Sequence, residues 1–510
     1  MKRALISVYD KDGIVDFAVS LKELGWEIIS TGGTSKVLKE AGVDILEVED
    51  ITKFPEILDG RVKTLNPYIH GGLLYKRDDE KHVRTIENMD IHGIDIVVNN
   101  LYPFEDTVER EGVSHGEIIE NIDIGGPSMI RAAAKNYKFV TVIVDPKDYE
   151  NVIRELKTSG ETKLATRQYL AAKVFNYTAY YDALIANYFN ELEDVDFPDR
   201  LTMTYKKEQE LRYGENPHQK AAFYREIGKV SGVLSSGRKI HGKELSFNNI
   251  NDSNGAIKIL KEFERPTIVA VKHSNPCGIG SGDNIEEAYI KAYECDKVSI
   301  FGGIIASNRE INREVAERIN SIFVEVVLAP SFSEEAIDIL TQKKNIRLIE
   351  IDDIENRDYR EMDMKKVLGG MLIQERDTKL LLDDVEIVTH RAPTEKEMED
   401  LLFAWKASKN VNSNGVVIAK DEATIGIGLG EVNRVWAVAN AIERAGENIE
   451  GSVLASDGFF PFKDSIEILG KAGIKAIIQP GGSIRDEEVI EEANRHGMAM
   501  VFTKIRHFKH

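Results

Sequence analysis

Two proton-active side chains stand next to each other at the end of an apolar run in the middle of the chain. The run "TIVAV" (267–271) is followed by Lys272 and His273, and then by a turn predicted over 275–278. An imidazole can remove a proton from a nucleophile, and an ammonium can stabilise an oxygen that becomes negatively charged. Adjacent side chains of a regular strand point to opposite faces, so both serve one site only if the strand ends or bulges there. The alternative is a strand end that is polar for no chemical reason.

A second group of polar residues, within the first 140 positions, has the composition of a phosphate site. The stretch "STGGTSK" (30–36) lies between a predicted strand and a predicted helix, where glycines and free backbone N–H groups can approach an anion. The stretch "RVKTL" (61–65) adds an arginine that can bind a phosphate with two N–H groups and a mobile lysine. A tight connection and a solvated basic turn are the alternatives. The candidate residues are Thr31, Gly32, Gly33, Thr34, Arg61, Lys63 and Thr64.

Further polar residues follow the predicted strands of the same region. Asn99, Asn100 and Tyr102 end an apolar run, Asp123 precedes a glycine pair, and Lys135 lies near the end of the next predicted helix. A tyrosine, an aspartate and lysines around a phosphate pocket suit proton transfers with stabilisation of an oxyanion. Alternatively, Tyr102 is a core residue with a satisfied hydroxyl group, and Asp123 is a helix N-cap.

The elements that must position these groups alternate between strand and helix patterns. Helices are predicted over 13–25 and 34–42, and strands over 4–8, 26–30, 44–48, 95–103 and 139–144. The last two strands are almost entirely apolar, which is typical of parallel strands buried on both faces. The pattern predicts a doubly wound α/β domain, in which ligands bind at the carboxyl ends of the strands.

The rest of the chain predicts a long helix and then a second α/β region. One continuous helix is predicted over 148–192, and the acidic, proline-containing stretch 193–200 predicts a boundary. Beyond it, "HSNPCGIGSG" with a later "IIASN" resembles "SNGVVIAKDEATIGIGLG" with a later "VLASD", which predicts two similarly folded halves. We expect domains at 1–195 and 196–510, the second divided into halves of about 196–370 and 371–510.

Composition excludes several classes of protein. A net charge of −20 and a pI near 5.2 argue against a nucleic-acid partner. Two cysteines, Cys277 and Cys295, supply neither a disulfide framework nor a CxxC metal site and indicate a reducing compartment. No apolar run approaches the ~20 residues of a membrane span, and the N-terminus does not resemble a signal peptide. We expect a cytoplasmic protein with no membrane partner.

Ten motifs, in order along the whole chain, resemble one family. They are "STGGTSK", "RVKTL", "NLYPF", "IDIGG", "RAAAKN", "LRYGENPHQ", "VKHSNPCG", "SNG", "FFPFKD" and the terminal "RHFKH". They are similar to the bifunctional purine-biosynthesis enzymes in which AICAR formyltransferase (AICAR, aminoimidazolecarboxamide ribonucleotide) is joined to inosine monophosphate (IMP) cyclohydrolase.

The resemblance implies the fold and the ligands. It implies an N-terminal methylglyoxal-synthase-like domain and a two-lobed transformylase with cytidine-deaminase-like halves that lack zinc. The reactions would be formyl transfer from 10-formyltetrahydrofolate to AICAR, and dehydrative closure of formyl-AICAR (FAICAR) to IMP. The family also implies small-molecule substrates and a homodimer whose transformylase sites lie at the subunit interface, and it leaves a requirement for a monovalent cation open.

The resemblance also assigns residue roles. For formyl transfer, His273 would be the base, Lys272 would stabilise the tetrahedral oxygen or protonate the departing folate nitrogen, and Asn414 would donate to the formyl oxygen. Nucleotide and folate contacts would come from Arg212, Tyr213, Gly302, Glu325, Arg434, Phe459, Asp464, Ser483, Ile484, Arg506 and His510. For ring closure, the catalytic residues would be Lys63, Tyr102, Asp123 and Lys135, and the binding residues Lys11, Thr31, Gly32, Gly33, Thr34, Arg61, Thr64, Asn99, Asn100 and Ile124.

Some positions depart from the family pattern and leave rival interpretations open. Tyr9 and Asp12 stand where many relatives have small hydroxyl residues, and Asn66 replaces a common histidine; Glu325 and Lys463 differ from the usual aspartate and arginine. One rival is a non-catalytic nucleotide sensor. A second is a transformylase with an inactive cyclohydrolase, and a third is a zinc deaminase.

Overall fold

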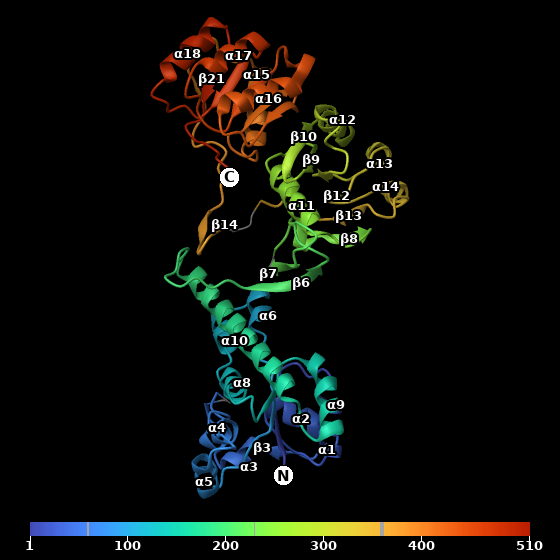
Figure 1. Cartoon of the computed structure of the whole chain (residues 1–510), viewed down its shortest axis with the longest axis vertical. Coiled ribbons are helices and arrows are strands. Elements are labelled where there is room, and N and C mark those ends of the chain that lie inside the picture. The colour runs from blue at the N-terminus through green and yellow to red at the C-terminus, as the bar shows by residue number, and fades with distance from the viewer. Residues whose placement is uncertain (59–60, 229, 358–361) are drawn as a thin grey trace. The chain divides into compact units, whose positions relative to one another are not determined.

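The computed structural model describes residues 1–58, 61–228, 230–357 and 362–510 (Figure 1). Contacts divide the chain into two compact units. The first contains Met1–Tyr205 with Glu226–Gly228, and the second contains Lys206–Arg225 and the remaining chain to His510. Each unit is described by itself.

The first unit is built on a five-stranded sheet with the order β3-β2-β1-β4-β5, and every pairing is parallel. Its strands are β1 (Arg3–Ile6), β2 (Glu27–Ser30), β3 (Leu46–Glu47), β4 (Ile96–Val98) and β5 (Thr141–Ile143). The strand order reverses beside β1, where a doubly wound sheet opens to ligands. The predicted doubly wound domain is confirmed.

Helices cover both faces of this sheet, which explains the nearly continuous apolar strands. One face packs against α1 (Ile14–Glu23), α2 (Gly32–Glu40) and α9 (Tyr149–Ser159), and the other against α4 (Pro67–Leu74), α8 (Gly125–Lys135) and α10 (Leu164–Leu192). In β4, Ile96 and Val98 belong to the first core and Val97 to the second. Shorter helices are α3 (Val48–Thr52), α5 (Glu80–Asn88), α6 (Phe104–Glu109) and α7 (His115–Glu120).

The single helix predicted over 148–192 is wrong. Gly160 adopts a left-handed conformation (φ 73°) after α9, and α10 begins only at Leu164. Glycine takes this conformation without steric cost, so it ends the first helix and lets the chain change direction. The helical pattern on each side is real, but the turn between the two helices was missed.

The second unit contains a twelve-stranded sheet with the order β16-β21-β20-β19-β17-β18-β10-β9-β11-β12-β13-β8. The first half supplies β8 (Arg238–His241), β9 (Thr267–Lys272), β10 (Asn275–Ser281), β11 (Ile304–Ser307), β12 (Val326–Ala329) and β13 (Arg347–Glu350). The second half supplies β16 (Glu386–Ile387), β17 (Val416–Lys420), β18 (Ala423–Gly428), β19 (Val453–Ser456), β20 (Ala476–Gln479) and β21 (Ala499–Phe502). The halves join where β10 pairs antiparallel with β18.

The two halves have the same strand order and the same strand directions. From the junction outward, each half has two antiparallel pairings, two parallel pairings and one antiparallel edge pairing. The predicted internal repeat is therefore confirmed. Two small separate sheets accompany it, formed by β6 (Tyr205–Leu211) with β7 (Ala221–Glu226) and by β14 (Met362–Val367) with β15 (Gly370–Glu375).

Helices are arranged alike in the two halves. α11 (Phe247–Leu260) and α15 (Glu395–Ser408) share one core on one face of the sheet. The other face packs against α12 (Ile285–Cys295), α13 (Arg313–Asn320) and α14 (Glu334–Leu340) in the first half, and against α16 (Arg434–Ala445), α17 (Asp464–Ala472) and α18 (Asp486–Arg495) in the second.

Close contacts between strand and helix also repeat. A methyl group placed on Gly280 would lie 2.6 Å from the carbonyl oxygen of Ala288 in α12. A methyl group on Gly428 would lie 1.9 Å from the carbonyl oxygen of Ala437 in α16. Only glycine therefore lets β10 and β18 approach their helices this closely.

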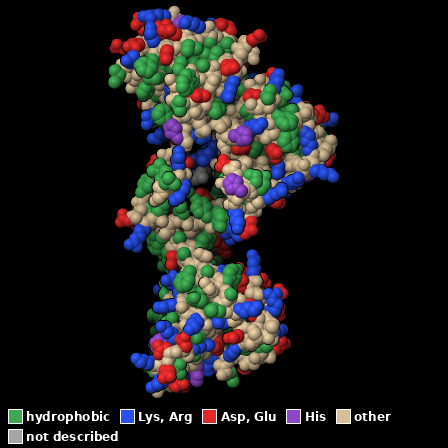
Figure 2. All heavy atoms as spheres, viewed as in Figure 1, with side chains coloured by type: hydrophobic (Ala, Val, Ile, Leu, Met, Phe, Trp, Pro, Cys, Tyr) green, Lys and Arg blue, Asp and Glu red, His purple; other side chains and the backbone are tan. Residues whose placement is uncertain are grey.

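The visible surface carries acidic and basic side chains interspersed with apolar ones (Figure 2). Such mixing is typical of soluble-domain surfaces rather than of a polyanion-binding face. Within the described ranges, no helix combines the length and the apolar character required to cross a bilayer.

Two candidate active sites

In the first unit, two ammonium groups lie at the N-terminus of α2. A methyl group placed on Gly32 would be 3.2 Å from the Lys63 ammonium, and one on Gly33 would be 3.9 Å from the Lys11 ammonium. Thr31 is the N-cap residue, with extended backbone. Free N–H groups at a helix start, together with two cations, form a site for a phosphate.

A second helix N-terminus, that of α8, carries the acid–base groups. Gly126 donates its N–H to Asp123 Oδ1 (2.8 Å), and the N–H of Asp123 donates to the hydroxyl of Tyr181 (2.9 Å). Burial raises the pKa of the Asp123 carboxyl, although N–H groups and the Lys63 ammonium oppose the change. Burial, together with the Asp123 charge, also raises the pKa of Tyr102. A carboxyl group with a raised pKa is suited to exchanging protons.

The structure distinguishes the alternatives for these two residues, which were a core tyrosine at Tyr102 and a helix N-cap at Asp123. Tyr102 is 45% exposed, so it is not a core residue. Its ring meets the edge of the Tyr9 ring at 6.0 Å. Asp123 does accept a hydrogen bond from the first turn of α8, as a capping residue would, and it also lies near Lys63 and Tyr102.

The asparagines and Thr64 complete this site. Asn100 Oδ1 accepts from the N–H groups of Tyr9 (2.6 Å) and Asp10 (2.9 Å), which fixes the loop that leads to Lys11. Asn99 Oδ1 is buried and has no hydrogen-bond partner among the described residues. A methyl group on Gly125 would lie 2.8 Å from Thr64 Oγ1. A substrate between the two helix starts could supply the missing donor to Asn99.

Three predicted residues of this site are placed differently. Arg61 forms an ion pair with Glu120 and is largely exposed. Ile124 lies exposed at the start of α8. Lys135 ends α8, about 15 Å along the helix axis from the Asp123 end at ~1.5 Å per residue. Lys135 instead lines a cavity of about 830 Å³ between α4, α8 and α10, so one chain does not bring it to Asp123.

In the second unit, the candidate centre lies on the hairpin that joins β9 and β10. The turn predicted at 275–278 is wrong: β9 ends at Lys272, the turn consists of His273 and Ser274, and Asn275 already belongs to β10. Both turn residues are left-handed, with φ 53° and 59°. Because the strand ends at Lys272, the side chain of His273 need not point to the opposite face of the sheet. Lys272 and His273 can therefore serve one site.

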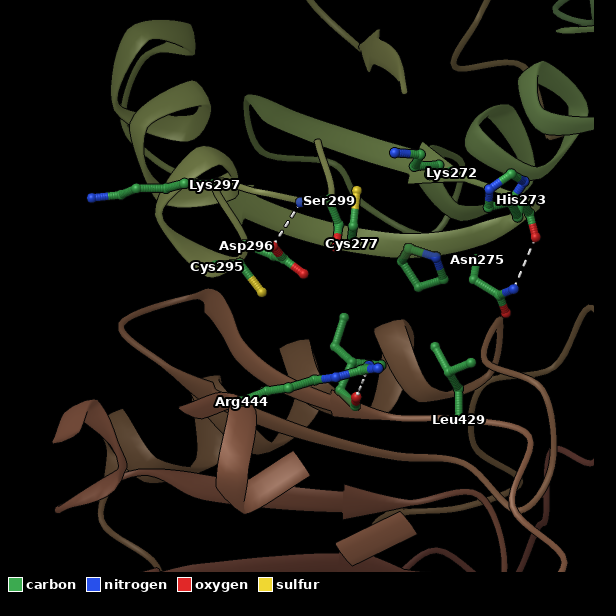
Figure 3. Close-up of a pocket in the computed structure, with 13 residues that line it drawn as sticks. Lys272, His273, Asn275, Cys277, Cys295, Asp296, Lys297, Ser299, Leu429 and Arg444 are labelled. Carbon is green, nitrogen blue, oxygen red and sulfur yellow. Dashed lines mark hydrogen bonds between the residues drawn. The ribbon is translucent and has the colours of Figure 1, made fainter. Parts of the chain in front are cut away.

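The hairpin borders a cavity of about 510 Å³ between the two halves (Figure 3). Lys272, His273 and Asn275 line it from the first half, and Arg444 lines it from α16 of the second half. The Lys272 ammonium donates to the carbonyl oxygen of Phe301 (2.8 Å). Sequence reasoning missed Arg444, which donates to the carbonyl oxygen of Ile427 (2.6 Å) and has no motif around it.

The two cysteines near this cavity are not nucleophiles. Burial raises the pKa of the Cys277 thiol to about 12 and that of Cys295 to about 11. Both thiols are therefore protonated at neutral pH and unreactive. Among the residues that the structure describes, no group of three or more His, Cys, Asp or Glu side chains could hold a metal ion.

Two predicted substrate contacts belong to the same half as the hairpin. Gly302 follows Phe301, which accepts from Lys272, and its left-handed backbone (φ 75°) donates to the carbonyl oxygen of Phe323. Glu325 forms an ion pair with Arg347. The Glu325 N–H donates to the carbonyl oxygen of Gly303 (3.0 Å).

Asn414 and Arg434 form a separate, buried network in the second half. The Arg434 guanidinium donates to Asn414 Oδ1 (2.8 Å) and pairs with the buried Asp457. The Asn414 side-chain amide donates to the carbonyl oxygen of Glu431 (2.8 Å). Asn414 does not line the cavity beside His273; its side chain is engaged by Arg434 and by the carbonyl oxygen of Glu431.

The C-terminal tail is joined to this network. Ser413 and Lys509 exchange hydrogen bonds, and the Lys509 ammonium donates to the carbonyl oxygen of Asn410 (3.0 Å). Arg506 lies over the ring of Phe508 at 4.5 Å, and the ring of His510 is 6.0 Å from that of Phe508. These contacts anchor the C-terminal tail.

Other predicted contacts are dispersed. Arg212 lies against the ring of Tyr213 after β6, Asp464 begins α17, and Phe459 and Ile484 are exposed. Ser483 Oγ accepts from the N–H of Arg485 (3.2 Å). These residues and the hairpin do not form one closed site within the chain.

The departures from the family pattern have local structural roles. Asn66 caps α4, accepting from the N–H of Tyr68 (2.9 Å). Lys463 pairs with Glu467 one turn along α17. Neither substitution displaces Lys63, Tyr102 or Asp123.

Comparisons with known proteins match two family models to successive parts of the chain. The model of the AICARFT/IMPCHase bienzyme family matches residues 133–444, and that of the MGS-like domain matches residues 13–128. A bifunctional purine biosynthesis protein PurH from Caldicellulosiruptor saccharolyticus is 57% identical, and one from a Thermoanaerobacter species is 58% identical; each alignment covers 100% of both chains. A solved structure titled "Crystal structure of ForH" is 36% identical, covers 37% of this chain and 98% of its own, and has a TM-score of 0.34.

A family model spanning more than half of the chain, together with full-length relatives, leaves one conclusion: the chain belongs to the AICARFT/IMPCHase bienzyme family.

Proposed function

We propose that the two sites divide the two reactions of the family, with formyl transfer in the second unit and ring closure in the first. As a member of this family, the protein is an AICAR transformylase and IMP cyclohydrolase that carries out the last two steps of IMP synthesis. We assign residues 1–195 to the cyclohydrolase and 196–510 to the transformylase, and we place the reactions in the cytoplasm.

For formyl transfer, we assign the proton-accepting role to His273. The amine of AICAR is a poor nucleophile, so it must lose a proton as it attacks the formyl carbon of 10-formyltetrahydrofolate. The new N–C bond forms as the bond from the formyl carbon to the folate nitrogen breaks, and that nitrogen takes up a proton. Lys272, held beside Phe301, would stabilise the tetrahedral oxygen or supply that proton.

For ring closure, the observation that carries the assignment is the place of Asp123 at the start of α8, where Gly126 donates to its carboxylate (2.8 Å) and Lys63 lies nearby; burial there also raises its pKa. The carboxamide nitrogen of FAICAR attacks the formyl carbon, and the formyl oxygen leaves as water after it gains two protons. Asp123 would accept a nitrogen proton, while Lys63 and Tyr102 would donate toward the oxygen. Lys11 and the start of α2 would hold the phosphate.

We further propose a homodimer, because neither predicted constellation is complete in one chain. Lys135 lies at the far end of α8 from Asp123, and Asn414 does not line the cavity that His273 lines. A second chain could place Lys135 beside the partner's Asp123 and Asn414 beside the partner's His273. The formyl-transfer sites would then lie at the subunit interface.

A product time course on untagged protein tests the assignment. AICAR and 10-formyltetrahydrofolate are mixed with the wild type, and nucleotides are separated at intervals. IMP that appears with little FAICAR supports two working sites. FAICAR that accumulates points to an impaired first unit, and absence of any product favours a nucleotide sensor.

A further inference from the structure

In the hairpin that carries His273, both backbone N–H groups of the turn donate to one carboxylate of α11, and the Asn251 amide of the same helix donates to the Ser274 hydroxyl (2.8 Å). Asp252 accepts two backbone hydrogen bonds, one from the N–H of His273 (3.0 Å) and one from the N–H of Ser274 (2.8 Å). The Ser274 hydroxyl donates to the same carboxylate (3.1 Å). Side chains other than glycine rarely adopt left-handed backbone, so these contacts oppose the relaxation of the turn.

The second half contains an equivalent carboxylate that binds an equivalent turn, but this turn carries no histidine. Asp400 of α15 accepts from the N–H groups of Asp421 (3.0 Å) and Glu422 (2.7 Å), which form the turn between β17 and β18. Both turn residues are left-handed, with φ 55° at each. The repeat therefore builds the same turn twice and clamps it in the same way.

What differs between the two turns is the side chain that each one presents. Asp421 pairs with Lys396, and Glu422 pairs with Arg265. The first turn instead presents His273 at the cavity between the halves. If the carboxylate served only folding, its removal should affect formyl transfer equally in both halves. If it aims a catalytic group, its removal should affect formyl transfer more in the first half.

We propose that Asp252 is a positioning residue for formyl transfer, which fixes the backbone of His273 so that its ring is aimed at the reacting amine. The inference rests on the proposed role of His273. Asp252 touches neither substrate in this proposal and acts only through the turn. The duplicated Asp400 supplies a matched control within the same molecule.

The test compares Asp252→Ala with Asp400→Ala, with Asp252→Asn as a milder variant in case the alanine variant folds poorly. For Asp252→Ala we expect kcat of formyl transfer to fall about 10²-fold, because misplacement by about 1 Å has effects of that size. We expect KM for AICAR and for the folate to stay within about twofold of wild type, since kcat alone reports the aim of the base. Ring closure of supplied FAICAR is the internal measure of folding. Asp400→Ala should keep the wild-type kcat of formyl transfer, even if its melting temperature falls as far as that of Asp252→Ala.

A double variant separates positioning from a structural role. If Asp252 acts through His273, Asp252→Ala added to His273→Ala should cause no further loss of kcat. Additive losses, or equal losses of kcat in Asp252→Ala and Asp400→Ala, would overturn the proposal. Full activity of His273→Ala alone would instead refute the role of His273, and the proposal would fall with it.

Discussion

The two candidate sites are assembled in different ways. In the first unit, two helix N-termini bring Lys11, Lys63 and Asp123 together within one compact sheet domain. In the second unit, His273 and Asn414 belong to different halves, and Asn414 is bound to Arg434 and does not line the cavity beside the hairpin. Apart from Lys135, the first site is made by one fold unit and should tolerate changes elsewhere, whereas a distributed site depends on every contact that aligns its parts.

The electrostatic settings differ as well. In the first unit, burial raises the pKa of a carboxyl group and of a phenol, and two ammonium groups lie at the start of α2, where a phosphate could bind. In the second unit, the thiols beside the cavity are kept protonated, and Lys272 is held by a carbonyl oxygen. We therefore expect the two reactions to respond differently to substitution and to pH.

The strongest separation of the sites should come from His273→Ala. Without the base, formyl transfer should fall about 10³-fold, within the range typical for general-base catalysis. Ring closure of supplied FAICAR should stay at the wild-type rate. Steady-state rates of both reactions on the same preparation provide the measurement, and parallel losses would contradict two independent sites.

The reverse separation should come from Asp123→Asn. Ring closure should fall about 10²-fold, because the amide cannot accept the proton, while formyl transfer stays intact. In the wild type, the rate of ring closure should fall as the pH drops through the Asp123 pKa, which burial places above the ordinary value of 3.8. A pH–rate profile shows this acid limb, and its persistence in the asparagine variant would show that another group is responsible.

Mixing inactive variants tests whether ring closure also needs a second chain. Lys135→Ala and Asp123→Asn, unfolded and refolded together, should form hybrid dimers in which one of the two sites carries neither substitution. Random pairing would then restore about a quarter of wild-type ring closure. Each variant refolded alone is the control. No recovery in demonstrated hybrids would place Lys135 outside the site.

The smallest effect should be seen in the tail. Burial lowers the pKa of Lys509 to about 8, so the unfolded chain binds more protons than the folded one between about pH 8 and the ordinary value of 10.5. This lysine therefore opposes folding when protonated, and its unfavourable effect disappears as pH rises through that window. Lys509→Met should melt at a higher temperature than the wild type at pH 7. This difference should be a few degrees smaller at pH 9.5. An unchanged difference between the two pH values would refute this.

The sequence predicted those features that depend on local pattern. Nearly all-apolar strands predicted the parallel sheet, and a Ser-Asn turn followed by an apolar strand ending in "ASN" or "ASD" predicted the two halves. The local pattern indicates Lys63 and Asp123, the family resemblance adds Lys11, and the fold brings them together. Asn99 and Thr64 join them for the same reason: each follows a strand or loop that ends at that edge.

What the sequence did not predict depends on contacts between distant segments. Asp252 lies in "NINDSN", where nothing distinguishes it from any helical aspartate, and only its approach to the turn reveals its role. Lys135 was grouped with Asp123 although a helix of known rise separates them. The turn at His273 was misplaced because Pro276 suggested a turn two residues later.

The close packing of β10 and β18 bears on how sequence variation in relatives should be interpreted. Gly280 and Gly428 meet helix backbone at distances that admit no side chain, and Gly426, which lines the cavity, meets the carbonyl oxygen of Ala441 in the same way. Substitution of these glycines is prevented by steric clash with helix backbone rather than by any catalytic role. An alignment would therefore mark glycines beside the cavity as invariant as strongly as the catalytic residues. Conservation alone would then enlarge the apparent active site along both strands, into positions such as Gly280 and Gly428 that do not line the cavity.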